Sequence, residues 1–278
     1  MKRIKNKEKT NNTLKKDFRR NLTIFNKFAK YYDRIYFDKN YKKECDFIFS
    51  NFKKFSNKPV KNLLDLGCGT GGHCIVFAKK GLSVTGIDKS DLAIQNAKEK
   101  AESLKLRINF EKEDMTKFSL NKKFDICVSM FCSFCYLNSI TEIINNLNCV
   151  NRHLKTGGLF IFDFWNGDAV ISEKPTTRVK IIEDGENRIL RIATPRLDQL
   201  NQTCAIEYHC IIIKNNKIID EFKEVHNLRY HFREELRNRL EEAGFEVLDF
   251  MPIEGKNKQS LKNSYSNEWY LYAITRKK

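Results

Sequence analysis

The sequence predicts an α/β fold: a doubly wound, mostly parallel sheet of seven strands with a small antiparallel β insertion after its fifth strand. Apolar residues run almost unbroken through 61–67, 124–131 and 158–164, as in strands covered on both faces. Helical patterns joined by short links separate these runs, which is typical of a doubly wound sheet. Residues 167–230 instead alternate apolar and polar positions and contain hairpin turns.

The parallel part follows in chain order. Residues 1–20 are expected to be a solvated basic tail, and an amphipathic helix is predicted over 41–55. Further helices are expected over 71–81, after the capping residue Ser90, and after the capping box from Ser139 to Glu142. Strands are expected at 61–67, 82–88, 107–114, 124–131 and 158–164.

The insertion and the end of the chain supply the remaining expected elements. Antiparallel strands are expected at 177–184, 188–195, 203–214 and 217–230, followed by a helix that ends at Gly244 and by strands at 245–251 and 268–276. We therefore expect three parts: the tail over 1–20, a ligand-binding α/β domain over 21–166 and 231–278, and a cap over 167–230.

Composition sets the broad class. Of the 278 residues, 51 are Lys or Arg and 35 are Asp or Glu, so the net charge is +16. This excess fits a polyanionic partner such as RNA, or the codon bias of an AT-rich genome; we favour the second. No apolar run approaches the ~20 residues of a membrane span, and no apolar segment follows the charged N-terminus as in a secretion signal. Nine scattered cysteines indicate reduced thiols, so we expect a cytoplasmic protein without a membrane partner.

Residues 64–72, LDLGCGTGG, place a glycine cluster directly behind the first buried strand. The spacing of Gly67, Gly69 and Gly72 fits a dinucleotide fingerprint, which would make the protein a nicotinamide-dependent oxidoreductase. The spacing of Gly67, Gly69 and Gly71 fits a different class of nucleoside binder. In both cases glycine lets the backbone come close to a ligand.

Three carboxylates at strand ends favour the second class. Asp65 precedes the glycines, where it would repel a pyrophosphate and attract an ammonium group. Asp88 ends the second strand and can accept hydrogen bonds from both ribose hydroxyls. Asp114 ends the third strand, where a carboxylate can accept from an adenine amino group. S-adenosylmethionine (SAM) carries an ammonium group, ribose hydroxyls and an adenine amino group, and it is the cofactor we expect.

The segments LLDLGCGTGGH, VTGID, EDM and FDICVSMF, in this order, resemble the motifs of class I SAM-dependent methyltransferases over about residues 25–165 and 231–278. FAKYYDRIY, MFCSFCYL and DFW, with the β-rich insertion, resemble more narrowly the group that includes sugar N-methyltransferases acting on nucleotide-linked aminosugars. The resemblance implies a Rossmann-like, SAM-binding domain. It implies that Tyr32 contacts the methionine end and that the cofactor is bound by Tyr32, Asp65, Gly67, Cys68, Gly69, Gly71, Asp88, Lys89, Asp114, Met115 and Met130.

Methyl transfer is an in-line displacement from a neutral leaving group, so the enzyme mainly positions the nucleophile and excludes water. A base is needed only for the proton of the nucleophile. The candidate catalytic residues are Tyr136 after the fourth strand, Asp163 at the end of the fifth, and His226 in the last strand of the insertion. Tyr136 is expected to orient the acceptor, and His226 can equally be a structural residue of the sheet.

The expected reaction is methyl transfer to a nitrogen or oxygen of a small molecule, with a nucleotide-linked (amino)sugar as one candidate acceptor. The main alternative is an RNA or protein methyltransferase that docks through the basic tail; the nicotinamide-dependent oxidoreductase is less favoured, and a SAM sensor without catalysis stays open. Cys127, Cys132 and Cys135 have the C-x4-C-x2-C spacing of plant-type ferredoxins. No well-placed fourth ligand stands out, so no metal site is expected.

Overall fold

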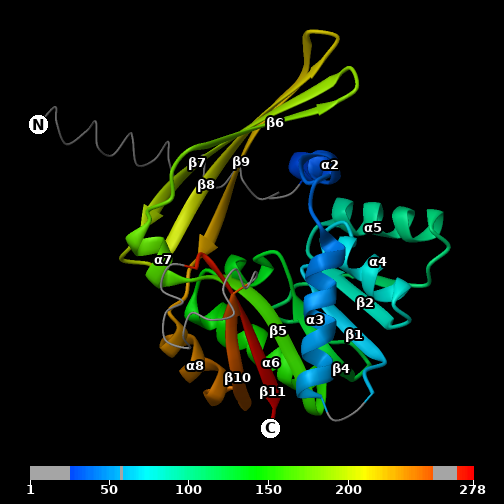
Figure 1. Cartoon of the computed structure of the whole chain (residues 1–278), viewed down its shortest axis with the longest axis vertical. Coiled ribbons are helices and arrows are strands. Elements are labelled where there is room, and N and C mark those ends of the chain that lie inside the picture. The colour runs from blue at the N-terminus through cyan, green and yellow to red at the C-terminus, as the bar shows by residue number, and fades with distance from the viewer. Residues whose placement is uncertain (1–25, 57–58, 253–267) are drawn as a thin grey trace, which may run out of the picture.

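The computed structural model describes residues 26–56, 59–252 and 268–278; the basic tail expected over 1–20 lies outside these residues. Two sheets organise the chain (Figure 1). The first has seven strands in the order β10-β11-β5-β4-β1-β2-β3, and the second has four in the order β6-β7-β8-β9. The predicted fold class is therefore confirmed.

The seven-stranded sheet has a parallel core. β1 pairs with β2 and β4, β2 with β3, and β4 with β5, all in parallel, while β11 runs antiparallel beside β5 and carries β10 at the edge. The strands are β1 (Asn62–Leu66), β2 (Ser83–Asp88), β3 (Asn109–Lys112), β4 (Phe124–Ser129), β5 (Leu154–Trp165), β10 (Phe245–Pro252) and β11 (Tyr270–Lys277).

Helices cover both faces of this sheet. One apolar cluster packs α3 (Tyr41–Phe55), α4 (Gly72–Lys79) and α5 (Asp91–Ser103) on one face. The other packs α6 (Ile140–His153) and α8 (Arg233–Glu242) on the opposite face. Strand β4 shows the division, because Ile126 and Val128 belong to the first cluster and Phe124 and Cys127 to the second. Burial on both faces explains the continuous apolar runs of the sequence.

The predicted caps of the helices are present. Ser90 accepts a hydrogen bond from the Ala93 N–H at 3.2 Å and begins α5. Ser139 and Glu142 form a complete capping box at the start of α6. Gly244 has φ +83° just behind α8, a left-handed conformation that glycine adopts at little cost.

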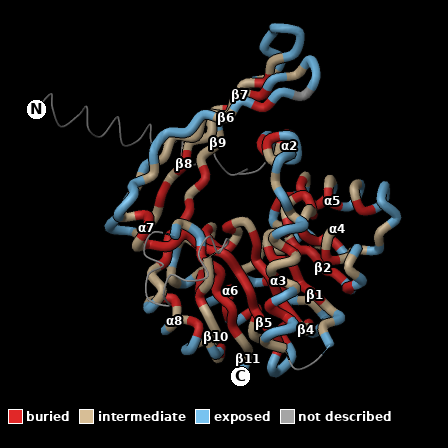
Figure 2. Tube along the Cα trace, in the orientation of Figure 1, coloured by how far each residue is buried: buried red, intermediate tan, exposed pale blue. Residues whose placement is uncertain are grey.

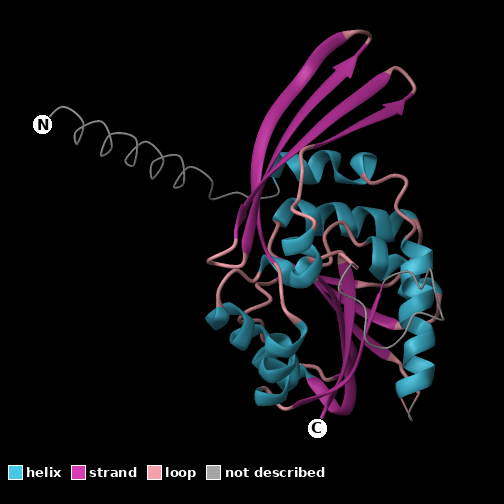
Figure 3. Cartoon of the chain, turned by 60° about the vertical axis from the view of Figure 1, so that its left-hand side comes forward, coloured by secondary structure: helices cyan, strands magenta, loops and turns pink. Residues whose placement is uncertain are grey.

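The second sheet is an antiparallel meander of long strands that rises away from the first (Figure 3): β6 (Arg178–Asp184), β7 (Asn187–Asp198), β8 (Thr203–Lys214) and β9 (Lys217–Arg229). The short helix α7 (Gly167–Ser172), which the sequence reading did not predict, precedes it. Both ends of the insertion meet at the first sheet, where the His231 N–H donates to Trp165 O and the Gly167 N–H donates to His231 O, each at 2.9 Å. Figure 2 shows that the parallel strands are buried and that the tips of the cap hairpins are exposed.

Helix α2 (Asn26–Ile35) was also not predicted, and it packs on the cap sheet. Phe28, Tyr31 and Ile35 form one apolar cluster with residues of β6 to β9. The two ends of the helix meet side chains of complementary charge. Glu224 accepts from the first-turn N–H groups, and Lys180 donates to Ile35 O at 3.1 Å. Both contacts suit the helix dipole.

The helices of the described residues include no segment with the length and apolar character of a membrane span.

Candidate active site

The glycine-rich loop joins β1 to α4 at the carboxyl edge of the parallel sheet. Gly67 and Gly71 have φ of +67° and +79°, which favours glycine. A Cβ on Gly67 would lie 2.7 Å from Cβ of Ser133 in the loop after β4. The close approach of that loop therefore also requires glycine at position 67. Ser133 Oγ donates to Gly67 O at 3.0 Å and links the two loops.

Asp88, at the end of β2, organises the same loop. Its Oδ2 accepts from the Gly69 N–H and its Oδ1 from the Ser90 N–H, both at 2.8 Å. Burial raises the pKa of Asp88 despite these bonds. The carboxylate oxygens have further lone pairs, so Asp88 can hold the loop and still accept from ligand hydroxyls. The Cys68 N–H donates to Ile87 O at 3.0 Å and fixes the loop beside the strand end.

Asp65 is a buried carboxylate with spare bonding capacity. It is 1% exposed, and its Oδ2 accepts from Cys74 Sγ at 3.1 Å. Its Oδ1 has no hydrogen-bond partner within the described part of the chain. Burial raises the pKa of Asp65 to about 6. An unpartnered carboxylate oxygen under a glycine loop fits a cationic ligand group, such as the ammonium of SAM.

Strand β3 ends at Lys112 and not, as predicted, at Asp114. Asp114 therefore lies in the turn that follows the strand. Its Oδ1 accepts from the Thr116 N–H at 2.9 Å and from Thr116 Oγ1 at 2.7 Å, while Oδ2 lies 3.4 Å from Lys89 Nζ. Burial opposes ionisation, but the Thr116 bonds and the Lys89 charge outweigh it and lower the pKa of Asp114. Met115 follows, and its methyl group lies 3.8 Å from the Cβ position of Gly67.

Tyr32 lies on α2, in an aromatic group with Phe28 and Tyr36. Burial raises the pKa of Tyr32. Helix α2 is joined to the glycine-rich loop through Asp33, which accepts from Thr70 Oγ1 at 2.6 Å. The helix that carries Tyr32 therefore bridges the cap and the loop.

The loop after β4 has a strained turn that Asp163 holds. Phe131 and Cys132 have φ of +59° and +60°, a backbone conformation that residues other than glycine rarely adopt. Asp163, at the end of β5, accepts from the Cys132 N–H at 2.8 Å and from Cys132 Sγ at 3.6 Å. Burial raises the pKa of Asp163 to about 6. The backbone oxygen of Met130, just before the turn, lies 2.9 Å from the same Ser133 Oγ and is an alternative acceptor for its one hydrogen.

Tyr136 and His226 meet although 90 residues separate them. Tyr136 ends the 3-10 helix η1 (Ser133–Tyr136), and His226 lies on β9 of the cap. The phenol oxygen is 2.7 Å from Nδ1 of the imidazole. His226 is 1% exposed, and burial raises the pKa of Tyr136. The cap thus returns to the loop that follows the fourth strand, where ligands of this fold bind.

A chain of contacting polar side chains beside the loop after β4 was not predicted from the sequence. Lys39 pairs with Glu44, and Glu44 contacts His73 Nε2 at 2.7 Å. Lys39 Nζ also lies 3.7 Å from the ring centroid of Phe131, a cation–π contact that supports the strained turn. The position of His73 directly after the glycines was the one available signal in the sequence.

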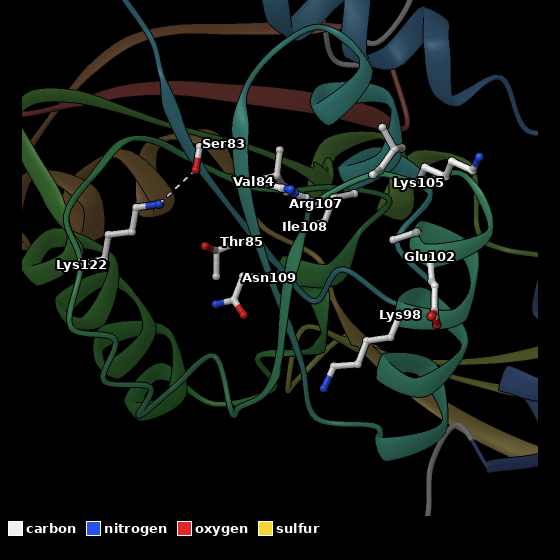
Figure 4. Close-up of a pocket in the computed structure, with 12 residues that line it drawn as sticks. Ser83, Val84, Thr85, Lys98, Glu102, Lys105, Arg107, Ile108, Asn109 and Lys122 are labelled. Atoms are coloured by element: carbon white, nitrogen blue, oxygen red, sulfur yellow. Dashed lines mark hydrogen bonds between the residues drawn. The ribbon is translucent and has the colours of Figure 1, made fainter.

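An open hollow of about 900 Å³ lies elsewhere, between β2, β3 and α5 (Figure 4). Its lining includes Ser83 and Asn109, which begin β2 and β3. Ligands of doubly wound sheets bind at the carboxyl ends of the strands, so we do not assign the reaction to this hollow.

Known proteins resemble this chain along most of its length. A family model described as "Methyltransferase domain" matches residues 57–194. A putative methyltransferase from Geobacillus sp. is 34% identical over 140 residues, and the match spans 50% of this chain and 56% of that protein. The dTDP-3-amino-3,4,6-trideoxy-alpha-D-glucopyranose N,N-dimethyltransferase of Streptomyces venezuelae is 25% identical over 79% of this chain and 90% of its own length.

Among solved structures, a SAM-dependent methyltransferase from Clostridium acetobutylicum has the same fold, with a TM-score of 0.74 over 91% of this chain and 98% of that one at 23% identity. Sequence motifs, sheet order and family model agree, so the chain belongs to the class I SAM-dependent methyltransferases.

Proposed function

We propose that this protein transfers the methyl group of SAM to an amino group of a small acceptor, with a nucleotide-linked aminosugar as the favoured class. The proposal rests on one observation: the hydrogen bond between Tyr136, in the loop after β4, and His226, on the cap strand β9. Relatives named as dTDP-aminosugar N,N-dimethyltransferases support the class of acceptor. The RNA and protein alternatives gain no support from the described residues.

The residues at the carboxyl edge of β1, β2 and β3 suit the cofactor. The free oxygen of Asp65 suits the ammonium group, Asp88 suits the ribose hydroxyls, and the turn at Asp114 and Met115 suits the adenine. SAM supplies an electrophilic methyl group on a sulfonium. Gly67, Cys68, Gly69 and Gly71 would wrap the cofactor, with Tyr32, Lys89 and Met130 at its borders.

The acceptor needs a route for its proton. An amine is mostly protonated at neutral pH and cannot attack a methyl carbon until it loses a proton. The phenol of Tyr136 stays neutral because burial raises its pKa, so we assign it two roles: it orients the amine and relays the proton of the amine to His226. The amine gives its proton to the phenol oxygen as the phenol gives its own to Nδ1 of His226. Asp163 holds the turn that places Tyr136 and does not take part in this transfer.

The cysteines agree with an intracellular setting. All nine are buried and none forms a disulfide, as expected for thiols in a reducing compartment. We therefore propose that the protein acts in the cytoplasm.

The test combines labelled SAM with a dTDP-linked aminosugar and measures turnover and SAM affinity separately. In Tyr136→Phe we expect near-normal SAM affinity and turnover reduced by roughly 10²-fold. Tyr230→Phe is the matched control, because Tyr230 is a buried cap tyrosine that donates to Gln199 O. Undiminished turnover in Tyr136→Phe would remove the phenol from the reaction. Label transferred from host extract to RNA or protein, with none on small molecules, would overturn the acceptor class.

A further inference from the structure

Glu224 connects the cap strand β9 to helix α2 and contacts His226. It lies on β9 two residues before His226, so both side chains are on the same face of the cap sheet. Its Oε2 lies 3.5 Å from His226 Nε2. Its Oε1 accepts from the N–H groups of Lys27 at 3.0 Å and Phe28 at 2.9 Å, in the first turn of α2.

We propose that Glu224 is a positioning residue: it orients His226, stabilises its protonated form, and makes this arrangement depend on the docking of α2. The inference rests on the proposed function, in which His226 receives the proton of the acceptor through Tyr136. The complete array then runs from Tyr136 through His226 to Glu224 and to the N-terminus of α2.

The first argument is the tautomer of His226. A neutral imidazole has one nitrogen that donates and one that accepts. For Nδ1 to receive a proton from Tyr136 it must be the accepting nitrogen, which leaves the hydrogen on Nε2. That nitrogen lies beside Glu224 Oε2, and a carboxylate there favours the required tautomer.

The second argument is the cost of charge in a buried place. The side chains of His226 and Glu224 are 2% and 12% exposed, so a charge on either side chain is costly unless the other side chain pairs with it. Tyr136 from η1 and Tyr208 from β8 also contact the ring, and Phe28 contributes an apolar ring from α2. Glu224 brings the opposite charge to this group. At a separation of 3.5 Å the two groups form a charge contact, and a small side-chain rotation would bring Nε2–H within hydrogen-bond distance of Oε2.

The third argument is what holds the carboxylate. Two backbone N–H groups bind Oε1, and the positive end of the helix dipole favours the ionised form. With Oε1 fixed, Oε2 stays directed toward His226. Asp220 strengthens the same docking, since its Oδ2 accepts from Tyr31 Oη at 2.9 Å. If α2 moves away, Glu224 loses its anchor and His226 loses its partner.

The main test is Glu224→Gln, which keeps an oxygen for the α2 cap and removes the charge. We expect SAM affinity and thermal stability close to the parent protein, with kcat lowered by roughly tenfold. The profile of kcat against pH should change as well, because the variant removes the carboxylate charge beside Nε2 of His226. Nitrogen-15 NMR of the cofactor-free protein should find the hydrogen of neutral His226 on Nε2.

The matched control is Glu221→Gln. Glu221 lies on the same strand and contacts His209 Nε2 at 2.6 Å, with its side chain 52% exposed. This variant also removes the carboxylate of a Glu–His pair, here between β9 and β8, and it should leave kcat and the pH profile unchanged.

Three outcomes would overturn the inference: an unchanged kcat and pH profile in Glu224→Gln, a neutral His226 with its hydrogen on Nδ1, or an equal effect of Glu221→Gln. The double variant with His226→Gln separates the two proposals. If His226→Gln lowers kcat and Glu224→Gln lowers it no further in that background, the two residues act together. If His226→Gln leaves kcat intact, the proton route of the proposed function fails by itself.

Discussion

Asp65 is a buried carboxylate, and we expect its burial to lower the stability of the cofactor-free protein. Burial raises its pKa from the usual 3.8 to about 6. Since one pKa unit corresponds to about 1.4 kcal/mol, ionised Asp65 destabilises the cofactor-free protein by about 3 kcal/mol. Because the folded-state pKa is raised, the protonated form adds stability below about pH 4 that is lost as the pH rises through about 6.

Asp65→Asn should therefore stabilise the protein and weaken its cofactor binding. Without SAM, we expect the free energy of unfolding at pH 8 to rise by up to about 3 kcal/mol, with a much smaller gain at pH 4. The amide oxygen can still accept from Cys74 Sγ. SAM affinity should fall by about 10- to 100-fold, because the ammonium group loses its buried counter-charge.

Urea unfolding at pH 4 and pH 8 and calorimetric SAM titration measure these effects. Asp125→Asn is the control, because hydrogen bonds from Lys155 and from the Lys61 and Asn62 N–H groups outweigh burial and lower the pKa of Asp125. That variant should lose stability at pH 8. A less stable Asp65→Asn at pH 8 would refute the burial argument, and undiminished SAM affinity would refute the ammonium contact.

Two further substitutions probe the loops around the site. Asp88→Ala leaves the Gly69 and Ser90 N–H groups without their acceptor, so unfolding free energy and SAM affinity should each fall by about 1–3 kcal/mol, by urea unfolding and calorimetry; intact SAM affinity would place the ribose elsewhere. Asp163→Ala frees the strained turn at Cys132, and we expect kcat to fall at least tenfold at similar SAM affinity. Asp163→Asn keeps the acceptor oxygen and should restore most of kcat; an equal loss in both variants would contradict the positioning role.

The sequence by itself determined the fold class, and it predicted an outline of the cofactor site. Buried parallel strands need continuous apolar runs, and helices need caps such as Ser90 and Ser139, so both leave local signals. The loop from Gly67 to Gly71 is similarly local, because positive φ angles and close contact both require glycine. The prediction of β3 was two residues too long at each end, and at its carboxyl end Asp114 has a polar turn role that alternation does not reveal.

Only the tertiary structure decided which distant side chains meet. Helix α2 gave no convincing signal because its apolar face packs on a sheet about 150–200 residues later in the chain, and that contact stabilises it. Asp163 was predicted as a candidate catalytic residue, and only the structure shows that its oxygens accept from Cys132 in the turn after β4. The pairing of Tyr136 with His226, and of His226 with Glu224, depends on how the long cap strands return over the first sheet. Such contacts depend on strand register and on the packing of separate elements, which residue order along the chain does not encode locally.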